Sequence, residues 1–115
     1  MDPDDVKLTA QVFRDAAVLI RVGGLQKNTY ERRAGSGLTS FCAIGALCAA
    51  AGIDHSNDLG GTKDVHVLCA ELWERFGLPF DEASSDEDRV PDWNDREETT
   101  AEDVINALTK IAEGL

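Results

Sequence analysis

The sequence predicts an all-α protein, folded as a compact single domain of about four helices around a buried central helix at about residues 40–51. The central helix is indicated by an uncharged, mostly apolar run from Ser40 to Gly52, whose end residues suit a helix N-cap and a helix C-cap. Three other segments place apolar residues at three- and four-residue spacing, which is typical of amphipathic helices. Because a helix that is apolar on every side is normally buried on every side, we expect these segments to pack around residues 40–51.

The first amphipathic helix is expected at about residues 3–22. Pro3 and the acidic residues beside it suit its start, and Gly23-Gly24 suits its end. Residues 25–39 are polar and contain glycine, which predicts a loop before the central helix. The apolar stripe of this first helix consists of Val6, Ala10, Phe13, Ala16, Ala17 and Ile20.

The next helix is expected at about residues 62–76, capped by Thr62 and ended by Gly77. Trp73 lies at the edge of its apolar stripe, which predicts partial exposure of the indole ring. This stripe consists of Val65, Leu68, Cys69, Leu72 and Phe76.

Residues 81–98 show no apolar period and carry nine carboxylates against two arginines, which predicts an acidic loop. Val90 and Trp93 are expected to anchor this loop onto the core. The last helix is expected to begin at Thr99, which has capping-box spacing to Glu102. Its apolar face consists of Val104, Ile105, Leu108 and Ile111.

Composition limits the classes of function. The 115 residues fit one domain, 1–115, and a net charge of −11 argues against binding to nucleic acid or to an anionic membrane surface. No apolar run reaches the ~18 residues of a membrane span. The N-terminal residues lack the features of a signal peptide, so we expect a cytoplasmic protein. The three cysteines, Cys42, Cys48 and Cys69, then read as buried free thiols.

Three short motifs resemble those of a known family. They are Gly23-Gly24-Leu25-Gln26-Lys27, Cys42-Ala43-Ile44-Gly45-Ala46-Leu47, and Trp93-Asn94-Asp95 followed by Thr99-Thr100. In this order they resemble a family of small uncharacterised proteins from actinobacteria and their phages, over about residues 10–112. The chain departs from that family at Leu25, where Trp is usual, and at Lys27, where Gly is usual. The resemblance implies a fold and a source but no activity, and it marks Cys42, Gly45, Trp93, Asn94 and Asp95 as the motif positions to explain.

Cys42 is the one candidate nucleophile with a recognisable setting. It is expected at the second position of the central helix, where the amides can lower the pKa of a thiol, and the stretch weakly resembles the nucleophile helix of NlpC/P60 cysteine peptidases. A hydrolase or transferase would combine Cys42 with His55 or His66 and with Asp95. Because no strand pattern follows either histidine, a buried structural Cys42 is favoured.

Asn94 and Asp95 are short polar side chains in a loop between helices. Such side chains commonly accept hydrogen bonds from the unpaired amides at a helix N-terminus. We therefore expect Asn94 or Asp95 to cap either the central helix or the last one. His66 and Cys69, even with Cys42, Cys48 and His55, match no zinc spacing, so we expect no metal and no cofactor.

These observations favour a small, acidic, non-enzymatic module that binds a partner protein, of actinobacterial or phage origin and acting on a host protein. The partner would be basic, because the acidic segment would attract it. The cysteine-dependent hydrolase or transferase is the alternative. The expected binding surface consists of Asp86, Glu87, Asp88, Trp73 and Phe80.

Overall fold

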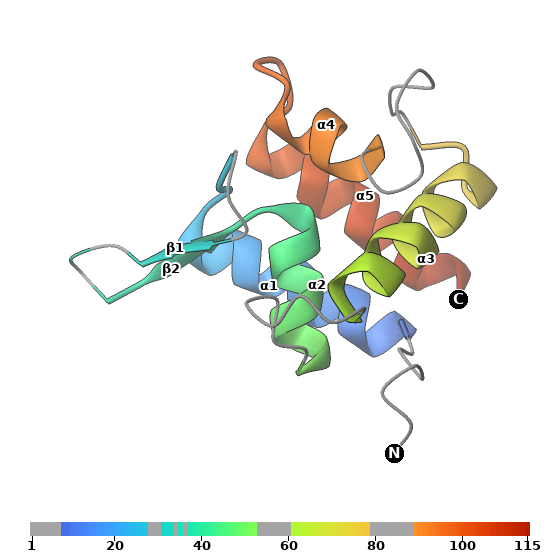
Figure 1. Ribbon diagram of the computed structural model, residues 1–115, viewed down its shortest axis with the longest axis horizontal. Coiled ribbons are helices and arrows are strands. Elements are labelled where there is room, and N and C mark those ends of the chain that lie inside the picture. The colour runs from blue at the N-terminus through green and yellow to red at the C-terminus, as the bar shows by residue number, and fades with distance from the viewer. Residues whose placement is uncertain (1–7, 28–30, 34, 36, 53–60, 79–88) are drawn as a thin grey trace.

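The computed structural model describes residues 8–27, 31–33, 35, 37–52, 61–78 and 89–115. In this part of the chain the elements follow the order α1 (Ala10–Gly23), β1 (Glu31–Arg33), β2 (Thr39–Phe41), α2 (Ala43–Ala51), α3 (Gly61–Arg75), α4 (Arg89–Asp95) and α5 (Ala101–Gly114). Figure 1 shows a helical body from which the β1–β2 hairpin projects to one side. The predicted, mainly helical class is confirmed, and a short antiparallel sheet is added to it.

The core is built mainly between α1, α2 and α5. The most extensive helix contacts join α1 to α5 and α1 to α2, while α2 also touches α3 and α4. Every residue of α2 from Ala43 to Cys48 is buried, but Ala49 is exposed. The central helix is therefore enclosed over its first six residues only, and the expectation that residues 40–51 are buried throughout is wrong at the C-terminal end.

The start of α1 differs from the expected one. The helix begins at Ala10, because the hydroxyl of Thr9 accepts a hydrogen bond from the amide of Val12 and so caps it. Residues 1–7, including Pro3, which was expected in the first turn, lie outside the described residues. The expected end is confirmed: α1 stops at Gly23, and Gly24 has a φ of 91°.

Residues 31–41 are not simply a loop. The strands pair antiparallel with Arg32 opposite Ser40, and Phe41 of β2 also exchanges backbone hydrogen bonds with Gly24 and Gln26 on its other side. β2 passes so close to α1 that a Cβ on Gly23 would lie 1.8 Å from the carbonyl oxygen of Thr39. A glycine is thus required there by a close backbone approach.

The predicted N-cap of the central helix is also corrected. Ser40 belongs to β2, where its one hydroxyl proton is shared between Gln26 Oε1, 2.9 Å away, and the carbonyl oxygen of Arg32, 3.2 Å away. The N-cap is Cys42, two residues later, whose sulfur accepts from the amide of Gly45 over 3.2 Å. The expected C-terminal glycine is confirmed, because Gly52 is left-handed with a φ of 75°.

Part of the segment predicted as an acidic loop is a helix, which its many charged residues did not indicate. Residues 89–95 form α4, with Val90, Trp93 and Asn94 buried on its inner face, so the expected anchoring by Val90 and Trp93 is confirmed. The capping box of α5 is made by Thr100 and Asp103, one residue later than expected. Thr99 is buried instead, and its hydroxyl donates to the carbonyl of Trp93 over 2.7 Å. This bond ties the end of α4 to the start of α5.

Candidate functional site

The N-terminus of α2 is capped from a distant part of the chain. The side-chain oxygen of Asn94, on α4, accepts a hydrogen bond from the amide of Ala43 over 2.9 Å. Ala43 is fully buried, so water cannot replace this partner. The expectation that Asn94 or Asp95 caps a helix is met by Asn94, and the capped helix is the central one.

The nitrogen of the Asn94 side chain joins α4 to one further segment, at residues 26–27. Asn94 Nδ2 donates to the carbonyl of Gln26 over 3.0 Å and to Asp95 Oδ1 over 3.1 Å. Lys27 Nζ donates to the carbonyl of Arg96, and lies 3.5 Å from the carbonyl of Glu97. A cation near these carbonyls suits the C-terminal end of α4, where unpaired carbonyl groups carry partial negative charge.

The three sequence motifs therefore meet in space. We call this meeting point the motif junction: residues 24–27, residues 40–45 and residues 93–97, linked through Asn94. Gly45 is buried in the first turn of α2, and its amide is bound by the Cys42 sulfur. The motif residues hold the fold together at this point.

Cys42 lies in a setting that keeps its thiol protonated. Its side chain is buried, and this burial raises its pKa from 9.0 to about 11, against a smaller lowering by nearby amides. The charge of Asp95 adds to the rise, so these two candidate residues are neighbours. A nucleophilic cysteine instead needs a lowered pKa. His66 lies on the inner side of α3, and His55 is outside the described residues.

The other two thiols are also kept neutral. Burial raises the pKa of Cys48 to about 12 and that of Cys69 well above its ordinary value. All three cysteines are free, as expected. In the described part of the chain, no group of three or more His, Cys, Asp or Glu side chains is arranged to hold a metal ion.

The expected place of Trp73 at a binding surface is wrong. Trp73 is fully buried, and its ring lies 5.6 Å from that of Trp93 at a tilt of 59°. Its indole nitrogen has no hydrogen-bond partner in the described part of the chain. Trp73 is buried because α4 packs over it. The apolar pattern of α3 alone could not predict this, because the covering residues belong to another helix. The other expected surface residues, Phe80, Asp86, Glu87 and Asp88, lie outside the described residues.

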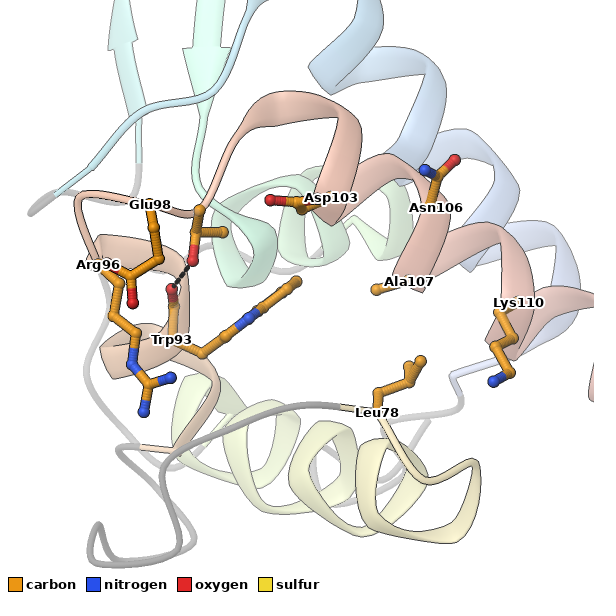
Figure 2. A pocket seen from close by; sticks show the side chains of 9 residues that line it. Leu78, Trp93, Arg96, Glu98, Asp103, Asn106, Ala107 and Lys110 are labelled. Carbon is orange, nitrogen blue, oxygen red and sulfur yellow. Dashed lines mark hydrogen bonds between the residues drawn. The ribbon is translucent and has the colours of Figure 1, made fainter.

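A pocket opens where α4, α5 and the end of α3 meet. We call it the Trp93 pocket; its volume is about 430 Å³, and its apolar lining comes from Leu78, Trp93 and Ala107 (Figure 2). Leu78 is placed by the turn that ends α3, in which its amide bonds to the carbonyl of Trp73 over 3.0 Å and Gly77 has a φ of 66°. One short helix, α4, thus directs Asn94 to the motif junction and Trp93 to the pocket.

The polar rim of the Trp93 pocket is charged at both ends. Arg96 and Glu98 lie at one end and Lys110 at the other, with Asn106 and Asp103 along α5 between them (Figure 2). The sequence reasoning missed Lys110 and Asn106 as surface residues. Their four-residue spacing beside the apolar Ala107 is the signal that could have found them, because it places all three on adjoining rows of one helix.

The fold and this arrangement define a small helical domain whose three motifs converge on one buried junction. The chain belongs to the family of unknown function DUF6197, whose model matches residues 5–114. No curated protein and no solved structure matches the chain. Among the described helices, none has the length and apolar character needed to cross a bilayer.

Proposed function

We propose that this chain is a non-enzymatic domain that binds a partner protein at the Trp93 pocket. The observation that carries the proposal is the pocket itself: an open apolar hollow beside a tryptophan, with charged groups around its rim. Binding surfaces of proteins commonly centre on a large aromatic side chain and surround it with polar groups. Trp93 is 5% exposed and forms a wall of the pocket; Trp73 packs against its ring, and the hydroxyl of Thr99 donates to its carbonyl.

The charge near the pocket favours a basic partner. Residues 97–103 contain four exposed carboxylates, Glu97, Glu98, Glu102 and Asp103, and no basic residue, which gives a local charge of −4. Two of them, Glu98 and Asp103, line the pocket together with the basic Arg96 and Lys110, so the lining itself is balanced and the negative charge lies along residues 97–103 beside it. The occupant proposed is an apolar side chain of the partner, flanked by lysine or arginine. This keeps the expected basic partner but moves the contact from residues 86–88 to residues 97–103.

The chemistry at Cys42 supports binding over the cysteine-dependent alternative. The sulfur is a buried hydrogen-bond acceptor for an α2 amide, and its raised pKa disfavours the thiolate that attack on a substrate requires. An actinobacterial or phage origin, a cytoplasmic location and action on a host protein are parts of the same proposal, and they rest on the resemblance and the composition alone.

Two charge reversals on exposed carboxylates test the proposal. Immobilised parent protein and the variants Glu98→Lys and Glu113→Lys are compared in quantitative capture from an actinobacterial lysate, and affinities are then measured for the purified partner. Glu98 lines the pocket, whereas Glu113 is exposed on α5 outside it, so the second variant is a matched control. We expect Glu98→Lys alone to weaken binding, and more strongly at low ionic strength. A partner held equally by both variants would contradict the proposed site.

The enzymatic alternative has its own test. Cys42→Ser retains a small polar side chain at the cap, so folding can be checked by circular dichroism and melting. If the folded variant keeps partner binding and biological effect, the binding proposal is supported. Loss of the biological effect with binding and stability unchanged would favour the enzyme.

A further inference from the structure

A second surface, on different elements from the Trp93 pocket, exposes apolar side chains. The described part of the chain has four large hydrophobic residues that are strongly exposed: Val18 at 55%, Val22 at 62%, Leu38 at 49% and the C-terminal Leu115 at 47%. Three of the four lie on α1 and beside the hairpin. Single exposed aliphatic residues are ordinary on a protein surface, but their gathering in one place marks an interaction site.

The geometry of α1 places the two valines in one row. They are four residues apart and point away from the buried stripe of Phe13, Ala16, Ala17 and Ile20. Val22 directly precedes Gly23, and Leu38 directly precedes Thr39, the two residues whose backbones meet where β2 crosses α1. Leu38 is therefore brought to the same end of α1 as Val22. We call Val18, Val22 and Leu38 the α1–hairpin patch.

The surroundings of this patch carry the charge opposite to that of the whole chain. The exposed arginines of α1 and β1 are Arg14, Arg21, Arg32 and Arg33; Arg14 and Arg21 lie one helical turn from Val18, and Arg33 pairs with Thr39, the neighbour of Leu38. The exposed carboxylates on these two elements are Asp15, which accepts a hydrogen bond from Gln11, and Glu31. Four arginines against two carboxylates give α1 and β1 together a charge of +2 in a chain of net charge −11.

The arginines alone have structural explanations. Arg21 lies in the last turn of α1, where a cation is favourable, and charged side chains on β1 protect an exposed strand edge from unwanted pairing. Neither reason accounts for two valines in one exposed row of a helix. The combination of an apolar row with flanking arginines is what an amphipathic acidic helix would complement, since helices pack through rows of side chains at three- and four-residue spacing.

We propose that the α1–hairpin patch is a second docking surface, and that its occupant is an amphipathic helix of a partner protein with an apolar stripe and flanking Asp or Glu. The partner's apolar side chains pack on Val18, Val22 and Leu38, and its carboxylates face the arginines of α1 and β1. The Trp93 pocket favours the opposite charge, so the domain joins an acidic partner to a basic one.

The test uses two synthetic helical peptides of roughly 15 residues, long enough to form helix on binding. Both carry leucine in one helical stripe, and the remaining positions are mainly glutamate in one and lysine in the other. Binding is followed by titration calorimetry and by the methyl NMR signals of valine and leucine. We expect the glutamate peptide to bind, to shift the signals of Val18, Val22 and Leu38, and to bind more weakly as salt is raised.

Matched variants separate the patch from other exposed residues. Val18→Ser with Val22→Ser is expected to weaken the glutamate peptide about tenfold or more, because covered aliphatic groups are lost. Leu115→Ser removes an exposed hydrophobe elsewhere and should leave affinity unchanged, as should Glu98→Lys at the Trp93 pocket. The last variant makes failure of the two surfaces distinguishable.

Four results would overturn the proposal. The first is no binding of the glutamate peptide, or shifts confined to other residues. The second is equal binding of the lysine peptide at the same patch, seen as equal shifts of the Val18, Val22 and Leu38 signals. The third is a concentration-dependent shift of the patch signals without peptide, which would show self-association of this chain. The fourth is tighter binding to vesicles of equimolar phosphatidylglycerol and phosphatidylcholine than to the peptide, which would assign the patch to an anionic membrane surface.

Discussion

Removing the side chain of Asn94 would test the motif junction directly. Asn94 is 1% exposed; its side-chain oxygen accepts from the amide of Ala43, and its side-chain nitrogen donates to the carbonyl of Gln26 and to Asp95 Oδ1. In Asn94→Ala these three bonds are lost together. The amide of Ala43 then stays buried without a partner, because it belongs to the first turn of α2 and has no bond inside the helix.

The expected loss of unfolding free energy can be worked out from these contacts. A buried polar group left without its partner costs about 1–3 kcal/mol. The Ala43 amide bears this cost in full, whereas the carbonyl of the half-buried Gln26 bears part of it, because water can approach it. Asn94→Ala should therefore destabilise by about 2–4 kcal/mol, a large share of the ~5–15 kcal/mol typical of a domain.

The assay is urea-induced unfolding, followed by far-ultraviolet circular dichroism and by the fluorescence of the two buried tryptophans. Asn106→Ala is the control, because Asn106 is exposed on α5 and should change stability by less than about 0.5 kcal/mol. A loss of less than about 1 kcal/mol in Asn94→Ala would show that the Ala43 amide does not depend on Asn94.

Asn94→Asp is a milder variant with a pH signature. It keeps an oxygen for the Ala43 amide but loses the donor to Gln26 and puts a second carboxylate near Asp95 Oδ1, which Asn94 Nδ2 now approaches to 3.1 Å. Repulsion from the carboxylate of Asp95 raises the pKa of the carboxyl group introduced at position 94 above its unfolded value of about 3.9. The carbonyl of Gln26 acts in the same direction, because only the protonated carboxyl group can donate a hydrogen bond to it. The folded variant thus binds a proton more tightly than the unfolded variant does. Its free energy of unfolding should therefore come closer to that of the parent as pH falls through that raised pKa. A deficit that is constant or grows on acidification would contradict this.

Three further outcomes are expected. Gly23→Ala should destabilise by about 1–3 kcal/mol, because its Cβ would meet a β2 carbonyl oxygen, whereas Gly35→Ala, with open space around it, should be neutral by the same urea assay. Cys42 should resist a thiol reagent until the protein is denatured, and fast labelling of the native protein would contradict its burial. Stability should fall as pH rises from 9.0 to about 11, because the thiol of the unfolded chain ionises at a lower pH than the buried thiol does. Thr100→Ala should lower the melting temperature by removing about 1 kcal/mol of capping at Asp103, and an unchanged value would place the cap elsewhere.

Structural features that depend on residues close together in the chain were predicted correctly from the sequence. Gly24, Gly52 and Gly77 mark helix ends as expected, because a left-handed or open backbone after a helix strongly favours glycine. Four residues of the predicted stripe of α1, Phe13, Ala16, Ala17 and Ile20, are likewise buried where their spacing placed them, whereas Ala10 is half-buried and Val6 lies outside the described residues. These features depend on a few consecutive residues, and the sequence therefore determined the helical class and most helix ends.

Where two nearby residues were equally suited to cap a helix, the tertiary structure decided which of them does so. Thr99 and Thr100 each have an acidic residue three positions later, and only the carbonyl of Trp93 decides that Thr99 is buried and Thr100 caps α5. Ser40 is a good cap in isolation, but pairing with β1 assigns it to a strand and leaves Cys42 as the cap.

The candidate site shows the same division. The sequence by itself marked the motif residues as positions to explain and predicted that Asn94 or Asp95 should cap a helix. Only the tertiary structure decided that Asn94 caps α2, that Trp73 is covered by α4, and that Trp93 lines a pocket with Lys110. The physical reason is that a cap, a covered ring and a pocket are each made by groups far apart in the chain, whose meeting is set by the packing of whole helices.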